Sequence, residues 1–151
     1  MFKTLVSLAL CATMGAFGGT MEEETLISQF KNATSVVVTI NNEQVNAELE
    51  SVVKNFEDMA EDAYFSPAFG VSIDNLTRAD KKTGVWVEFN FDGTHEFAGM
   101  PYEKLLINIQ PNFYGFNIIR FNNNKYDGRC YYLNLAKTSD DFYNYLISLK
   151  K

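Results

Sequence analysis

The feature that most constrains this fold is a series of short segments after residue 84 in which apolar and polar residues alternate. The first, residues 84–91 (GVWVEFNF), alternates strictly and is followed by Asp92-Gly93, a dipeptide typical of tight hairpin turns. Comparable strand-like segments follow at residues 94–98, 104–110, 116–121 and 129–135. The connections between them are shorter than the crossovers that parallel strands require, so we expect an antiparallel meander.

Two amphipathic segments predict helices that cover one face of this sheet. The longer, residues 46–63, begins at Asn46 as a helix cap and places its apolar residues on one face at a period of 3.6. The second begins at Ser139 and ends near Lys150. Two further strands are expected at residues 34–40 and 69–73. With 151 residues, the chain is long enough for one core. The sequence therefore predicts a single α+β domain at residues 20–151, with an antiparallel five- to six-stranded meander sheet and helices packed on one face.

Residues 1–19 differ in composition from the rest of the chain. Lys3 precedes an uncharged run rich in Leu, Val and Ala, and the small residues of Ala16-Phe17-Gly18 follow. This order is typical of a secretory signal peptide and predicts a secreted or periplasmic protein after cleavage. The alternative is a mis-assigned start, because the codons of Gly18-Gly19 can form a ribosome-binding site before Met21. The protein would then be cytoplasmic.

Five segments between residues 67 and 149 form a distinctive set. They are PAFGVS (67–72), MPYEKLLI (100–107), GFNIIR (115–120), GRCYYLNL (128–135) and YNYL (143–146). On these segments the chain resembles small uncharacterised proteins of low-GC Gram-positive bacteria. The resemblance implies a shared fold and no activity, and it counts against export because members of that group lack a leader. Cleavage would also leave Cys130 as a single thiol, which is more natural in a reducing compartment.

The chain offers few residues for catalysis or metal binding. His95 is its only histidine, and Glu96, the next residue on the same strand, points to the opposite face. Residues 123–128 match part of a calcium loop, but Lys125 occupies a position that an oxygen ligand must take. Glycine-rich phosphate loops and paired-cysteine motifs are absent from the sequence. We therefore predict no catalytic residue, no metal and no cofactor, and a hydrolase that uses His95 is the third of our hypotheses.

The polar face of the expected sheet is the first candidate binding surface. Aromatic, amide and charged side chains mix there, which is a composition typical of protein interfaces. The candidate residues are Trp86, Glu88, Arg120, Tyr132 and Asn134. The alternative is that a loop or the N-terminal helix covers this face and the aromatic residues form a second small core.

Charge provides the second candidate surface. Residues 21–66 contain ten acidic and two basic residues, whereas residues 67–151 have a net charge of +1. The acidic face of the 46–63 helix can attract a basic partner, and solvation of the helix is the alternative interpretation. The candidate residues are Glu50, Glu57, Asp58 and Glu61. The formal net charge of −6 argues against nucleic acid and anionic membranes as partners.

Size, charge and the lack of recognisable chemistry favour a small non-enzymatic protein-interaction module, such as an inhibitor or immunity-type protein. It would bind through the aromatic–polar sheet face, the acidic helix, or both. The alternative is a secreted or periplasmic protein that binds a small ligand or a glycan, because aromatic rings flanked by amides suit sugar rings.

Overall fold

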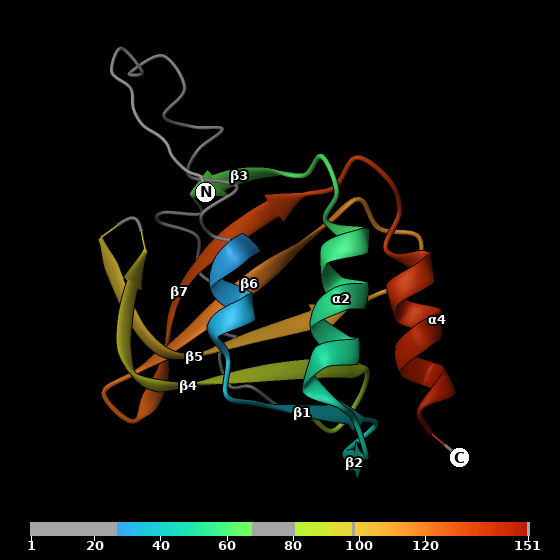
Figure 1. The fold of residues 1–151 in the computed structure, drawn as a ribbon, viewed down its shortest axis with the longest axis horizontal. Helices are drawn as coiled ribbons and strands as arrows, with labels where there is room; N and C mark the ends of the chain where they lie inside the picture. The colour runs from blue at the N-terminus through green and yellow to red at the C-terminus, as the bar shows by residue number, and fades with distance from the viewer. Residues whose placement is uncertain (1–26, 68–80, 98, 151) are drawn as a thin grey trace.

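A seven-stranded antiparallel sheet forms the centre of the structure, and the helices lie on one of its faces (Figure 1). The computed structural model describes residues 27–67, 81–97 and 99–150, and within these ranges all side chains except those of residues 65–67 and 127–131. The strands are β1 (Ser35–Ile40), β2 (Glu43–Val45), β3 (Tyr64–Pro67), β4 (Val85–Phe97), β5 (Met100–Ile109), β6 (Gly115–Asn122) and β7 (Lys125–Asn134). The helices are the 3-10 helix η2 (Phe30–Asn32), α2 (Leu49–Met59) and α4 (Asp140–Ser148).

The predicted α+β class is confirmed, and so is the antiparallel sheet with helices on one face. Strands β4 to β7 pair in sequence order, as a meander requires. The full strand order is β2-β1-β4-β5-β6-β7-β3. Strands β1 and β2 extend the β4–β7 meander at one edge and β3 extends it at the other, so the sheet has seven strands instead of the expected five or six. The strand expected at residues 69–73 and the leader at residues 1–19 lie outside the described residues.

Helix α2 is shorter than the helix predicted for residues 46–63. Asn46 is not its cap, because Glu43–Val45 pair with β1 and the chain stays extended as far as Glu48. Glu48 occupies the N-cap position without a side-chain hydrogen bond to the helix. Residues 46–48 of the predicted helix therefore form the connection between β2 and α2, and residues 60–63 follow the end of α2.

The core lies between the helices and the sheet and is centred on Phe56 of α2. The Phe56 ring lies 4.4 Å from Phe30, 5.7 Å from Phe89, 5.9 Å from Phe116 and 6.0 Å from Phe142, measured between ring centroids. These partners come from η2, β4, β6 and α4. The Phe30 ring is tilted and the other three are edge-to-face, and such packing adds to the energy of burial. Because one side chain contacts four elements, it fixes the position of α2 on the sheet.

Asparagine supplies the left-handed backbone conformation at several turns. Positive φ angles occur at Asn41, Asn42, Asn112, Asn123 and Asn124. Asparagine tolerates this conformation better than most residues because its side chain can bond to the local backbone. Asn123 and Asn124 form the turn that connects β6 to β7. Across the described ranges, no helix has the length and apolar character needed to cross a membrane.

Candidate functional site

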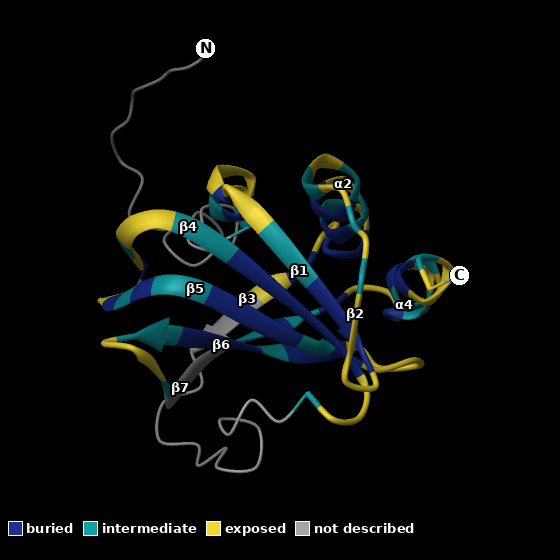
Figure 2. Cartoon of the chain, turned by 90° about the horizontal axis from the view of Figure 1, so that it is seen from below, coloured by how far each residue is buried: buried dark blue, intermediate teal, exposed yellow. Residues whose placement is uncertain are grey.

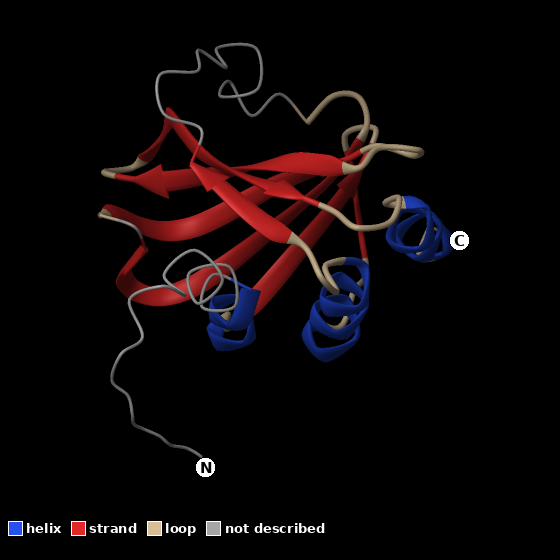
Figure 3. Cartoon of the chain, turned by 90° about the horizontal axis from the view of Figure 1, so that it is seen from above, coloured by secondary structure: helices blue, strands red, loops and turns tan. Residues whose placement is uncertain are grey.

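The second face of the sheet points away from the helices (Figures 2 and 3). Val87 and Phe89 of β4 belong to the core, so their neighbours Trp86 and Glu88 point to this second face. Trp86 is only 5% exposed, and its Nε1 donates a hydrogen bond to the Thr83 carbonyl at 2.8 Å. Little of the indole is therefore accessible to a partner.

Arg120 does not share a face with Trp86, so its predicted place in the polar surface is wrong. The strand register sets Arg120 opposite Leu105, a core residue on the helix-covered side, and paired residues share a face. The Arg120 side chain is buried, and its Nη1 donates to the Pro101 carbonyl at 2.5 Å. In the segment FNIIRF, both faces of β6 carry apolar residues, so alternation alone did not show which face Arg120 takes.

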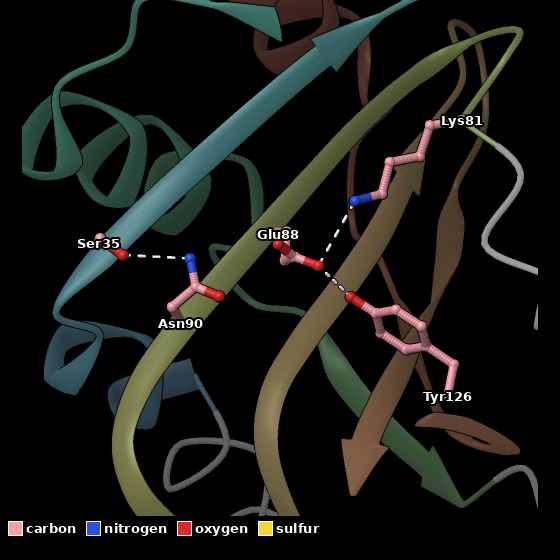
Figure 4. Close-up of polar contacts among 5 residues, drawn as sticks. All are labelled: Ser35, Lys81, Glu88, Asn90 and Tyr126. Carbon is pink, nitrogen blue, oxygen red and sulfur yellow. Dashed lines mark hydrogen bonds and ion pairs between the residues drawn. The ribbon is translucent and has the colours of Figure 1, made fainter. Parts of the chain in front are cut away.

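Glu88 is the centre of a small polar cluster on the second face (Figure 4). Its Oε2 accepts a hydrogen bond from the Tyr126 hydroxyl and lies 3.4 Å from Lys81 Nζ. Burial, together with the hydrogen bond and charge of Glu88, raises the pKa of Tyr126 above its ordinary value, so Tyr126 stays protonated and donates at neutral pH. One position further along this face of β4, Asn90 Nδ2 donates to Ser35 Oγ at 3.1 Å. Glu88 thus has partners within the chain, as buried carboxylates in structural roles do.

His95 packs against an aromatic ring in the β4–β5 hairpin. Its ring stacks on Tyr102 with centroids 5.8 Å apart, and its Nε2 lies 3.1 Å from the Asp92 carbonyl oxygen. Glu96 pairs with Pro101 in the sheet and points to the face opposite His95. In the described part of the chain, no group of three His, Cys, Asp or Glu side chains could hold a metal ion.

Three of the four acidic candidates, Glu57 and Asp58 of α2 and Glu61 just after its end, form ion pairs with lysines. The ion pairs are Glu57–Lys31 at 3.2 Å, Asp58–Lys54 at 3.9 Å and Glu61–Lys137 at 3.8 Å. Glu50, the fourth candidate, is exposed and forms no ion pair with a described residue. Such exposed pairs stabilise a protein little, but they reduce the charge available to a basic partner.

Among the described side chains that follow β4, the most exposed aromatic ones lie in the connection between β5 and β6. We call residues 111–114 the aromatic loop, because Phe113 is 51% and Tyr114 62% exposed. Neither residue is predicted as a binding residue from the sequence, because the segment lies between two expected strands and has no periodicity of its own. The available signal was the Phe113-Tyr114 pair itself, which places two large aromatic residues inside a turn.

The N-terminus of α4 holds the aromatic loop in place. The Ser139 main-chain nitrogen donates to the Phe113 carbonyl at 2.9 Å, and the Ser139 hydroxyl donates to the Gln110 carbonyl. The Asn112 nitrogen donates to Asp140 Oδ1 at 2.7 Å, and Asn112 has a positive φ of 63°. The loop is therefore fixed by side-chain and main-chain groups far from it in sequence.

A cavity of about 120 Å³ lies beside the aromatic loop on the second face of the sheet. Its lining consists of Asn108, Gln110, Phe113, Gly115, Phe116, Asn117, Ile119 and Tyr132. We call it the amide cavity after its three carboxamide side chains. Of the predicted surface residues, Tyr132 contributes to this lining, and Asn134 lies one position further along the same face of β7. Trp86 pairs with Asn108 at the border of the cavity.

Gly115 and Tyr132 meet at the floor of the amide cavity. A Cβ atom built on Gly115 would overlap the Tyr132 hydroxyl and lie 2.6 Å from its Cζ, which is closer than real side chains approach. The absence of a side chain at residue 115 therefore leaves room for the hydroxyl end of the Tyr132 ring beside Gly115. This arrangement sets the shape of the cavity.

No family model, no curated protein and no solved structure matches this chain.

Proposed function

We propose that the chain is a small non-enzymatic protein-interaction module that binds its partner through the aromatic loop and the adjoining amide cavity. The observation that carries this proposal is that Phe113 and Tyr114 are exposed on a loop that is itself held in place by hydrogen bonds. Both side chains are more than half exposed, yet the loop that bears them is held by hydrogen bonds that Ser139 donates and that Asp140 accepts.

A rigid loop with exposed aromatic residues is well suited to binding. Ordering a flexible loop on association costs free energy, and a loop that is already ordered avoids that cost. Aromatic anchors dominate the binding energy of many protein interfaces because each buries a large area with few rotatable bonds. Exposed aromatic pairs also lower solubility, so their fixed exposure favours a role in recognition.

The size of the amide cavity favours a protein partner over a complete small ligand. Sites for drug-sized ligands occupy roughly 300–1,000 Å³. The amide cavity measures about 120 Å³, which accommodates a single side chain. The glycan-binding alternative is therefore less well supported than a protein interface with one inserted side chain.

An inhibitor or immunity-type role toward a basic effector is the finer form of this proposal. It is supported by the net charge of −6, which attracts a basic partner over distances longer than a contact. The lysine pairs on α2 argue that the acidic face contributes to association rate more than to the contact itself. Export is part of the proposal too, and a native N-terminus near Gly19 in the medium or periplasm would support it over translation from Met21.

The test is comparative capture of partners from an extract of the source cells. Immobilised wild-type protein and the double variant Phe113→Ala/Tyr114→Ala are compared by quantitative mass spectrometry. We expect the bound partner to fall at least about tenfold in the double variant, because truncated hot-spot aromatics cost about 2 kcal/mol or more.

The matched control is Ile147→Ala, which removes an exposed apolar side chain from α4, outside the loop and the cavity. We expect it to retain the partner at the wild-type level. A double variant that captures every wild-type partner equally well would show that the aromatic loop is not the binding surface.

A further inference from the structure

The amide cavity contains hydrogen-bonding groups that the described residues do not use. Asn108 Nδ2 donates to the Val85 carbonyl at 3.0 Å, and Asn108 Oδ1 accepts from Gln110 Nε2 at 3.2 Å. Each NH₂ group carries a second hydrogen, and Gln110 Oε1 accepts no hydrogen bond from the described part of the chain. Donors and acceptors thus line one small cavity and are available to a guest.

The lining excludes a charged guest. None of its eight residues carries a charge at neutral pH. A cation or anion that entered the cavity would lose hydration without meeting an opposite charge, which is strongly unfavourable. Ile119, Phe113 and Tyr132 supply apolar contact instead. The cavity is therefore suited to a neutral group that both donates and accepts hydrogen bonds.

We infer that the amide cavity binds a carboxamide, the side chain of an asparagine or glutamine residue on the protein partner. This inference rests on the proposed function for the source of that side chain. A carboxamide is neutral, has two donor hydrogens and one acceptor oxygen, and therefore complements the free groups of Asn108 and Gln110. A single side chain also matches the cavity volume of about 120 Å³.

The test uses the full chain labelled with ¹⁵N and follows the side-chain NH₂ resonances of Asn108 and Gln110 by NMR. Acetamide, acetate and methylammonium are the probes, at equal concentration and ionic strength. We expect saturable shifts with acetamide and apparent affinities at least about tenfold weaker for the two ions. Equal responses to all three probes, or no response to acetamide, would overturn the inference.

Gln110→Glu is the diagnostic variant, because it removes the NH₂ group and adds a negative charge at nearly constant shape. We expect at least about a tenfold loss of acetamide affinity, followed through Asn108. Gln44→Glu is the matched control, since Gln44 is an exposed residue of the edge strand β2 and lies outside the cavity. If Gln110→Glu binds acetamide as well as wild type does while its backbone spectrum is unchanged, the assignment is wrong.

A second pair of probes identifies the source of the carboxamide. Capped glutamine represents a protein side chain, and N-acetylglucosamine presents the same amide group on a sugar. Tighter binding of the capped glutamine supports the inference, whereas at least tenfold tighter binding of the sugar would assign the cavity to glycans and overturn it. The capture experiment tests the proposed function independently of this inference. If Phe113→Ala/Tyr114→Ala loses the partner but acetamide causes no shift, the proposed function stands and only this inference is wrong.

Discussion

The buried hydroxyl of Ser139, at the N-cap of α4, donates its hydrogen bond to the main-chain carbonyl of Gln110 and not to its own helix. An N-cap serine ordinarily accepts a hydrogen bond from the first turn of the helix that it precedes. In this protein the helix makes no such side-chain bond, and the hydroxyl fixes the start of the aromatic loop instead. The helix terminus thus contributes to the proposed binding surface without being part of it.

Ser139→Ala should lower the free energy of unfolding by about 1–3 kcal/mol, because it leaves the Gln110 carbonyl without its donor. Urea denaturation measures this change. Ser148→Ala removes an exposed hydroxyl that bonds only to Tyr145 and should stay within about 0.5 kcal/mol of wild type. We also expect Ser139→Ala to weaken partner capture, since the loop loses an anchor. Capture at the wild-type level would mean that loop rigidity is unimportant for binding.

Phe56→Ala should lower the free energy of unfolding by about 3–5 kcal/mol, because the side chain is fully buried and contacts aromatic rings from four elements. Calorimetry or denaturant unfolding measures the loss. Phe113→Ala, at a half-exposed position, is the comparison and should cost far less. A loss at residue 56 no larger than that at residue 113 would contradict the packing of α2 described above.

Tyr102→Phe should leave stability unchanged or raise it by up to about 1 kcal/mol, because the Tyr102 hydroxyl is fully buried and bonds to no described residue. The variant should also alter the dependence of stability on pH. Burial raises the pKa of Tyr102 to about 12, above the ordinary value of about 10, so the folded state keeps a proton that the unfolded state loses. The contribution to stability is complete below pH 10 and is lost as the pH rises toward 12.

Unfolding measured between pH 9 and pH 11.5 therefore should show a shallower alkaline decline in Tyr102→Phe than in wild type. Tyr64→Phe is the control, since Tyr64 is 54% exposed. It should keep the wild-type slope. Identical slopes in wild type and Tyr102→Phe would show that this hydroxyl does not titrate differently in the folded state.

Gly115→Ala should destabilise the fold by about 1–3 kcal/mol, since the added methyl group overlaps the Tyr132 side chain. In a Tyr132→Ala background the same substitution should cost much less, because the obstructing ring is gone. A double-mutant cycle on unfolding free energies measures the difference. Additive effects would show that the two residues do not contact each other as described.

Sequence patterns predicted the faces of the sheet well because strand faces follow strict rules. The hairpin turn expected at Asp92-Gly93 is wrong, because β4 continues through this dipeptide to Phe97 with a register shift between Asn90 and His95. In GVWVEFNF, alternation separates Val87 and Phe89 from Trp86 and Glu88, and the structure keeps that division. The pattern gave no such guidance for Arg120, since both faces of β6 carry apolar residues and only the register with Leu105 decides. Asn46 was mistaken for a cap because the preceding strand β2 has only three residues, too few for a visible period.

The candidate site was harder to predict than the fold, because long-range contacts create it. The bond from Ser139 to Gln110 joins positions 29 residues apart, and no local pattern indicates it. Phe113 and Tyr114 lie in a turn, where periodicity says nothing about exposure. Gly115 has a negative-φ strand conformation, so the reason for glycine there is visible only once Tyr132 is placed across it.

The order of strands also bears on how the chain reaches this structure. β1 and β3 come from one stretch, residues 35–67, yet they flank the β4–β7 meander on opposite sides. Hairpins between sequence neighbours close quickly, whereas pairing between distant segments is slow. We therefore expect the meander to form first, with both of its outer strands unpaired until the 35–67 stretch arrives. During that interval, strands of two different molecules can pair with each other. We therefore expect aggregation during refolding at high protein concentration more than from the folded protein.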